Sequence, residues 1–270
     1  MLKFFYSFLF VLITSFNWAQ IGILEQVKSF DFKETIGNWT IDNIGNLIVQ
    51  QENMLVKIDT TGKQVFTQSI KSLGEISQIA TINSMKVVLF SEEQQCICLL
   101  DNTLTINGKC KYLEDYGLRN AKFIATSNRP NLIWIFDQFN STIFLVDIIK
   151  DKIVQKVENF AGLAGIMSEI VSMEEYNNKL YLQDATTIFE FDQMLSWSNS
   201  FVKQATSNAF WMNFIVGFQD KSLVYTSIKL NESFKSEINS NDSMKQLKIN
   251  GNDFYFCGEK KITKFKVKSK

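Results

Sequence analysis

The chain of 270 residues contains no histidine and only one proline, Pro130. Without histidine, Ser-His-Asp and Cys-His nucleophile systems, histidine-ligated metals and a histidine proton shuttle are excluded. The glycine motifs that cradle phosphates are missing as well. We therefore identify no catalytic residue, no metal ligand and no cofactor site from the sequence.

An excess of charge of either sign is also missing, because 28 basic side chains face 28 acidic ones. Proteins that bind nucleic acid or coat anionic membranes need an excess of lysine and arginine. The balance excludes nucleic acid as a general partner. An unidentified protein or glycan is the partner class that we expect, with the chain itself a monomer.

Long hydrophobic runs are scarce, and the longest lies at the start of the chain. Lys3 precedes an apolar run over residues 4–13, and polar residues then lead to Ala19, after which cleavage is expected. This is the layout of a secretory signal peptide. The run is too short to span a bilayer comfortably, which takes about 20 residues. We predict a signal peptide over 1–19, an exported domain over 22–270 with no membrane span, and a periplasmic or extracellular location; the alternative is an uncleaved anchor.

What the chain does contain is a repeated pattern of short strands with a period in the forties. Four strands end in an aspartate, and each follows another apolar strand such as "KVVLF" or "NLIWIF"; the aspartates are Asp59, Asp101, Asp147 and Asp192. A period of this length with several strands per unit is typical of β-propeller blades. An aspartate at the same place in each unit fits a turn, where its carboxylate accepts hydrogen bonds from backbone N–H groups. A catalytic or metal-binding role is the alternative.

The repeat predicts an all-β fold, a propeller of about six four-stranded antiparallel blades with less than a tenth of the chain helical. The last unit lacks an outer strand, and residues 26–32 near the N-terminus are free to supply it. Such closure covers an otherwise open sheet edge. Units after residue 200 lack the marker aspartate, so five and seven blades are the alternatives.

The segment "NLIWIFDQFNSTIFLVD" (131–147) and the turn at 57–63 resemble secreted bacterial β-propeller proteins of the NHL-repeat-like kind, in particular the uncharacterised single-domain group exported by Gram-negative bacteria. The resemblance covers nearly all of the chain after the signal peptide. It implies the fold and carries over no catalytic residue.

Three of the four cysteines fall in one predicted hairpin. Cys96 and Cys98 share one face of a strand, and Cys110 lies on the next strand. A turn at 101–104 would place Cys110 opposite Cys96, so in an oxidising compartment we expect a Cys96–Cys110 disulfide, with Cys98–Cys110 as the second choice. A four-cysteine zinc site would need Cys257, which lies in the last blade.

Acidic pairs and tryptophans are the remaining candidates for function. Glu114 with Asp115, and Glu174 with Glu175, fall in expected loops and are interpreted as solvated surface. Trp197 has polar neighbours and is the candidate for an exposed aromatic that stacks on a ligand. We expect a non-enzymatic propeller that presents loops to a protein or glycan; the alternative is a carboxylate-based hydrolase or lyase acting on an extracellular polymer.

Overall fold

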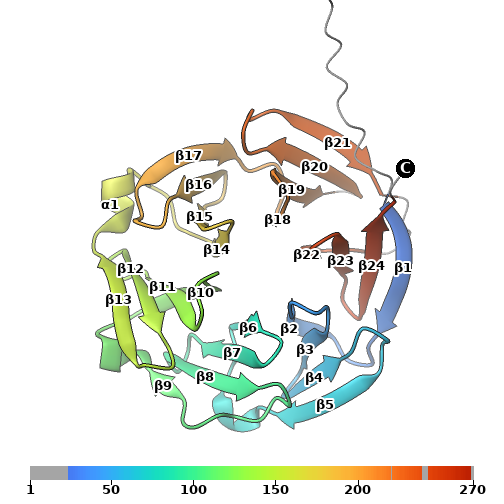
Figure 1. Cartoon of the computed structure of the whole chain (residues 1–270), viewed down its shortest axis with the longest axis horizontal. Helices are drawn as coiled ribbons and strands as arrows, with labels where there is room; N and C mark the ends of the chain where they lie inside the picture. Colours follow the sequence, from blue (N-terminus) through green and yellow to red (C-terminus); the bar gives the residue numbers. More distant parts are fainter. Residues whose placement is uncertain (1–23, 220, 239–242, 269–270) are drawn as a thin grey trace, which may run out of the picture.

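Six four-stranded antiparallel sheets stand around a central axis in the structure, a computed structural model that describes residues 24–219, 221–238 and 243–268 (Figure 1). Each sheet is one blade, and its first strand lies next to the axis. The predicted fold class, an all-β propeller of six four-stranded blades closed by an N-terminal strand, is confirmed. The predicted signal peptide over 1–19 lies outside the described residues.

The first three blades follow one another along the chain. Their strands, from the axis outward, are β2 (Ile36–Ile41), β3 (Leu47–Gln51), β4 (Met54–Ile58) and β5 (Gln64–Ser69); β6 (Gln78–Asn83), β7 (Lys86–Ser91), β8 (Cys96–Asp101) and β9 (Lys111–Tyr112); and β10 (Ala121–Thr126), β11 (Leu132–Asp137), β12 (Thr142–Asp147) and β13 (Lys152–Val157).

The next two blades repeat this order, and the sixth combines both ends of the chain. The strands are β14 (Ser172–Tyr176), β15 (Lys179–Gln183), β16 (Thr187–Phe191) and β17 (Trp197–Val202); β18 (Ser207–Trp211), β19 (Phe214–Gln219), β20 (Ser222–Ser227) and β21 (Ser233–Glu237); and β22 (Gln246–Asn250), β23 (Asp253–Cys257) and β24 (Lys261–Val267), completed by β1 (Leu24–Asp31).

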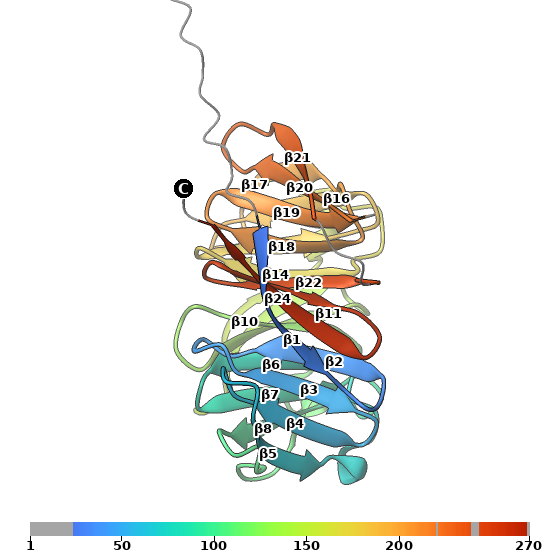
Figure 2. The ribbon, with the colours of Figure 1, turned by 90° about the vertical axis from the view of Figure 1, so that its right-hand side faces the viewer.

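Strand β1 closes the ring as the outer strand of the sixth blade. It pairs antiparallel with β24, from Leu24 opposite Val267 to Asp31 opposite Lys261, with a bulge at Val27 (Figure 2). The side chain of Phe30 is buried in a cluster that includes Ile262 of β24 and Ile36 of β2. The closing strand therefore contacts both the last blade and the first.

Apolar side chains between neighbouring blades form the core. The middle strands β11 and β12 are buried along their whole length. Trp134 of β11 packs with Leu182 of β15 from the next blade, and Phe254 of β23 packs with Trp211 of β18. Because both faces of a middle strand meet a neighbouring sheet, an apolar residue is favoured at every position. The outer strand β13 alternates exposed and half-buried residues, as expected at the rim.

The repeated aspartates shape turns, as predicted. Oδ1 of Asp59 accepts hydrogen bonds from the backbone N–H groups of Thr61 and Lys63, both at 2.9 Å. Asp101, Asp147 and Asp192 accept equivalent backbone bonds two to four residues ahead. These hydrogen bonds lower the pKa of the Asp59 carboxyl, and the bond from the Thr61 hydroxyl has the largest effect.

In residues 24–219, 221–238 and 243–268, helical structure is confined to connections between blades. It consists of α1 (Phe160–Ala164) and two 3-10 turns, η1 (Lys71–Leu73) and η2 (Leu113–Tyr116). Strand β9, the outer strand of the second blade, is only two residues long. Gly108 adopts a positive φ of 84° in the segment before it, and η2 begins directly after it. No helix in the described part of the chain is long and apolar enough to span a membrane.

Replacing Phe30 by alanine should destabilise the propeller, because Phe30 is the buried anchor of the closing strand. The expected loss in the free energy of unfolding is about 3–5 kcal/mol, the usual cost of a phenylalanine cavity. Val27→Ala is the matched control: Val27 sits on the same strand but is 54% exposed at the bulge, and its change should stay within about 0.5 kcal/mol. Urea unfolding followed by tryptophan fluorescence measures both, and equal losses would contradict this role of β1.

Candidate functional site

A polar cavity of about 490 Å³ occupies the centre of the ring. All six inner strands contribute to its lining, which combines amides and hydroxyls with apolar side chains such as Ile82 and Phe210; the polar and charged members include Thr40, Asn43, Gln78, Thr81, Asn83, Thr126, Asn128, Glu174, Asn208, Lys248 and Asn250. A second cavity of about 390 Å³ shares Met173, Glu174, Asn208, Leu247 and Lys248 with the first. These five residues therefore lie where the two cavities meet, and we call the combined space the axial channel.

Glu174 and Lys248 bring opposite charges into the axial channel from β14 and β22. Glu174 is exposed to the channel space, and Lys248 is half-buried. The protein that surrounds the channel raises the pKa of the Glu174 carboxyl to about 7, an effect that the charge of Lys248 partly opposes. The same loss of water lowers the pKa of Lys248, with Glu174 acting in the opposite direction. A carboxyl with a pKa of about 7 can exchange a proton with a ligand near neutral pH.

Lys248 is positioned by an aromatic ring from the first blade. Its Nζ lies 5.3 Å from the centre of the Trp39 ring, within the range of a cation–π contact. Nε1 of Trp39 donates a hydrogen bond to Oε1 of Gln246, two residues before Lys248 on the same strand. This contact fixes β22 against β2 at the channel wall.

Glu175, next to Glu174 in sequence, has a different task. Its Oε1 accepts a hydrogen bond from the backbone N–H of Asn128 at 2.9 Å, and its Oε2 accepts one from Nε1 of buried Trp134. Both glutamates line the cavity, but the carboxylate of Glu175 is engaged by the neighbouring blade, whereas that of Glu174 makes no hydrogen bond in the described part of the chain. The expectation that they lie in a solvated loop is wrong, since both are on inner strand β14. Glu114 and Asp115 are surface residues of η2, as expected.

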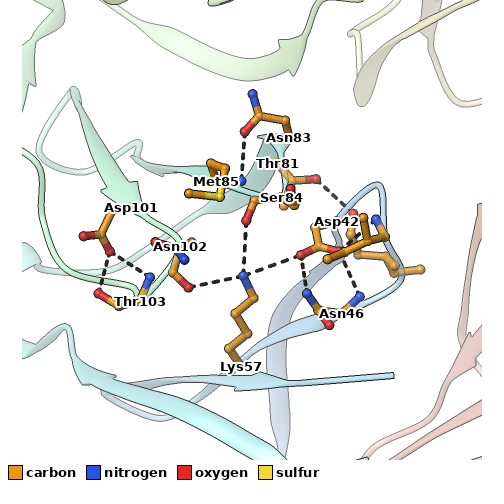
Figure 3. Close-up of polar contacts among 12 residues, drawn as sticks. Asp42, Asn46, Lys57, Thr81, Asn83, Ser84, Met85, Asp101, Asn102 and Thr103 are labelled. Carbon is orange, nitrogen blue, oxygen red and sulfur yellow. Dashed lines mark hydrogen bonds and ion pairs between the residues drawn. The ribbon is translucent and has the colours of Figure 1, made fainter. Parts of the chain in front are cut away.

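A buried ion pair fixes the channel wall between the first two blades (Figure 3). Lys57 is 4% exposed and Asp42 1%. Nζ of Lys57 lies 3.5 Å from Oδ2 of Asp42 and donates to the carbonyl oxygens of Ser84 at 3.4 Å and Asn102 at 3.2 Å. The three donors of the ammonium group thus meet three acceptors, two of them from the second blade.

Asp42 completes this network by capping its own turn. Its Oδ1 accepts backbone hydrogen bonds from Ile44 and Asn46, and its Oδ2 accepts one from the Asn46 side chain at 2.7 Å. Asp42 lines the channel, but its acceptor sites are occupied by the protein. Its role is structural.

The cysteine pairing differs from the first choice made from sequence. The disulfide joins Cys98 to Cys110, the second choice, while Cys96 and Cys257 are buried free thiols. The expected Cys96–Cys110 pairing is wrong because Cys96 lies opposite Tyr112.

The register explains this difference. The hairpin begins in the expected register, with Leu100 opposite Ile106, but β9 pairs Ile97 with Lys111. The segment around Gly108 adds two residues between these points. Counting back from the pair of Ile97 and Lys111 therefore places Cys110 opposite Cys98.

The tryptophans divide as expected between core and surface. Trp39, Trp134 and Trp211 are buried, whereas Trp197 is 60% exposed on the outer strand β17. The exposure of Trp197 is therefore as expected, and stacking on a ligand stays a prediction. Because β17 is at the rim of the blade (Figure 1), Trp197 is not part of the axial channel.

No group of three or more histidine, cysteine, aspartate or glutamate side chains in the described ranges could hold a metal ion. The sequence did not single out Lys248, Asn208 or the amides that line the channel. The available signal in the sequence was the position of Glu174 and Lys248 in the middle of short strands. This signal indicates a channel site only when the blade assignment shows that both strands are inner strands.

Comparison with known proteins supports the fold and nothing finer. Virginiamycin B lyase from Staphylococcus aureus has a TM-score of 0.64 at 12% identity, covering 89% of this chain and 99% of that one. A catalytically inactive His-to-Ala variant of that lyase with quinupristin has a TM-score of 0.61 at 13% identity, covering 91% and 98%. The WD40 domain of Pan2 from Neurospora crassa has a TM-score of 0.62 at 8% identity, covering 93% and 97%. No protein-family model matches the chain, and no curated protein matches it.

Lys57→Met should destabilise the fold by about 3–5 kcal/mol, because it leaves the Asp42 carboxylate buried without its cation. Adding Asp42→Asn should recover part of this loss, since the buried charge is then gone. Lys63→Met, at an exposed turn position, is the control and should change the free energy of unfolding by no more than about 0.5 kcal/mol. A double-mutant cycle by chemical denaturation gives the coupling energy, and additive losses would rule out the pair as an inter-blade contact.

Peptide mapping under non-reducing conditions should recover a Cys98–Cys110 peptide from the protein isolated from its native cell. Cys96→Ser should keep this bridge, because Cys96 is not part of it. Reduction should lower the free energy of unfolding by about 2–4 kcal/mol or less, since the closed loop is short. A bridge that involves Cys257 would contradict the blade assignment, and four free thiols would argue against an oxidising compartment.

Proposed function

We propose that the protein is an exported, non-enzymatic β-propeller of the NHL-repeat-like kind that binds a protein or glycan through its loops and the mouth of its axial channel. It acts as a monomer. The β-propeller fold is described above. The proposed binding role is supported by the residues that line the channel.

The observation that carries the proposal is a channel of ligand-binding size whose polar groups are mostly neutral. Ligand sites usually have volumes of about 300–1,000 Å³ with a few polar groups that fix orientation. The repeated aspartates are engaged in turns, Asp42 holds Lys57, and Glu175 holds Trp134. A hydrolase that uses two carboxylates needs both near the same bond. The described residues offer the channel one free carboxylate, Glu174.

The absence of histidine supports a role without catalysis. The lyase neighbour is catalytically inactive when a histidine is replaced by alanine. This chain has no histidine at any position, so it cannot supply that side chain. Similarity of fold alone does not transfer an activity.

A lyase or hydrolase acting on an extracellular polymer is the second candidate, and one observation favours it. The pKa of Glu174 is raised to about 7, which suits a general acid or base at neutral pH. Lys248 in the same channel could stabilise a developing negative charge. Appearance of new reducing ends or unsaturated products from bacterial or plant polysaccharides, abolished in Glu174→Gln, would establish this candidate in place of the first.

Export is proposed from the N-terminal sequence. Lys3, the apolar run over 4–13 and the small residue Ala19 have the layout of a signal peptide. The prediction of a periplasmic or extracellular location also agrees with a disulfide, which persists in oxidising compartments.

The test uses the secreted chain, purified from the periplasm or the medium of a Gram-negative host. The purified protein is applied to an array of bacterial and plant glycans and, in parallel, to surface proteins of the producing cell. We expect saturable binding to one class without turnover, and an N-terminus near residue 20. Retention of Met1 in a membrane fraction would refute export, and no saturable binding in either assay would refute the binding role.

A further inference from the structure

The charged side chains that line the axial channel can be assigned one by one. Asp42 is paired with Lys57, Glu175 accepts two hydrogen bonds, and Nζ of Lys203 donates to the carbonyl oxygen of Asp184 at 3.0 Å. This leaves two groups, the Glu174 carboxylate and the Lys248 ammonium. Neither makes a hydrogen bond, or an ion pair within 4.0 Å, to any residue in the described part of the chain.

The two remaining charges are of opposite sign and reach the channel from two different blades, with Asn208 on the blade between them. Nδ2 of Asn208 is already engaged by Gln183 and the carbonyl oxygen of Ala205. An anion attracted to Lys248 would be repelled by Glu174. A cation attracted to Glu174 would be repelled by Lys248. A neutral ligand can use both, donating a hydrogen bond to the carboxylate and accepting one from the ammonium group.

Asparagine side chains surround the end of the channel at which the inner strands finish. Asn43, Asn83, Asn128 and Asn250 lie at or just after the last residues of β2, β6, β10 and β22, and all four line the main cavity. Oδ1 of Asn83 accepts from the backbone of Met85, and Nδ2 of Asn250 donates to the carbonyl oxygen of Asp42. The side chains of Asn43 and Asn128 make no hydrogen bond within the described ranges. Each free carboxamide offers a donor and an acceptor side by side.

We propose that the axial channel binds the end of a neutral saccharide, which enters between the asparagines and places neighbouring hydroxyls against Glu174 and Lys248. A sugar hydroxyl both donates and accepts, so two adjacent hydroxyls satisfy the carboxylate and the ammonium group at once. Hydrogen bonds to charged partners are the stronger ones. The carboxamides of Asn43 and Asn128 at the mouth form hydrogen bonds with the next hydroxyls of the saccharide. The channel is large enough for a small ligand, which favours a chain end over the middle of a polymer.

This inference rests on the proposed binding function and narrows its ligand to a glycan held in the channel. Isothermal titration calorimetry of the full exported chain with glucose, galactose, mannose, N-acetylglucosamine and their β-linked dimers tests it. Glucuronate, glucosamine and glycine are the charged probes. We expect at least one neutral sugar to bind, and to bind more tightly than its charged counterpart.

Two pairs of variants separate the channel from the rest of the surface. Glu174→Gln should weaken binding about tenfold and Lys248→Met about 10- to 100-fold, because each removes one charge-assisted hydrogen bond. Glu114→Gln on η2 and Lys152→Met on the outer strand β13 are the controls, and both should bind as the parent does. Asn128→Ala keeps the backbone contact to Glu175 and should also weaken sugar binding. It replaces Glu174→Gln as the test if that variant proves unstable.

The outcomes distinguish this inference from the proposed function. Sugar binding that is unchanged in Glu174→Gln, Lys248→Met and Asn128→Ala would overturn the channel site and leave a glycan-binding surface elsewhere, for example at Trp197. Preferential binding of glucuronate, glucosamine or glycine would overturn the neutral ligand. Binding of a protein partner with no response to any sugar would overturn the inference alone. If the chain binds neither a sugar nor a protein, the proposed function is refuted as well.

Discussion

Closure of the ring by β1 and β24 is the constraint on which the other features depend. Each sheet covers its apolar faces with its two neighbours, so an open ring would leave one face of the first sheet, one face of the sixth sheet and the edge of β24 uncovered. The outer strand of the sixth blade comes from the N-terminal end of the chain, and Phe30 carries the contact on to the first blade. Because the circle is closed, the six inner strands are held at fixed positions around the axis, and the channel has a defined lining.

Local chemistry made much of this fold predictable from the sequence. Apolar runs such as "NLIWIF" specify middle strands, and Asp59 or Asp147 specifies the turn that follows the third strand, because both effects involve neighbours in sequence. The hairpin of β8 and β9 shows the limit. The turn at Asp101 was predicted, but the two residues added around Gly108 shift the register and move the disulfide from Cys96 to Cys98. A bulge of this kind depends on how the strand meets η2, which a local pattern does not contain.

The channel was much less predictable, because its lining comes from residues that are distant in sequence. Glu174 and Glu175 look like a carboxylate pair when the chain is read as a line. On inner strand β14 both residues line the main cavity, but the Glu175 carboxylate is held by Trp134 and by the backbone of Asn128 in the neighbouring blade. These contacts come from a different blade, so the segment "SMEEY" alone does not show that Glu175 is engaged and Glu174 is not. The opposite charge in the channel, Lys248, comes from a strand two blades away, and no spacing rule connects it with Glu174.

In this propeller, different residues determine the fold and line the channel. The faces of the sheets are used for packing, and their residues must be apolar whatever the protein does. The inner strands and the turns are less constrained by packing, and chains with 8–13% identity share this architecture. In this chain the axis carries amides and hydroxyls among apolar side chains, and Glu174 and Lys248 are its two charged groups that make no hydrogen bond in the described part of the chain. Many hydrogen-bonding groups around two such charges are what the neutral, hydroxyl-rich ligand proposed above requires.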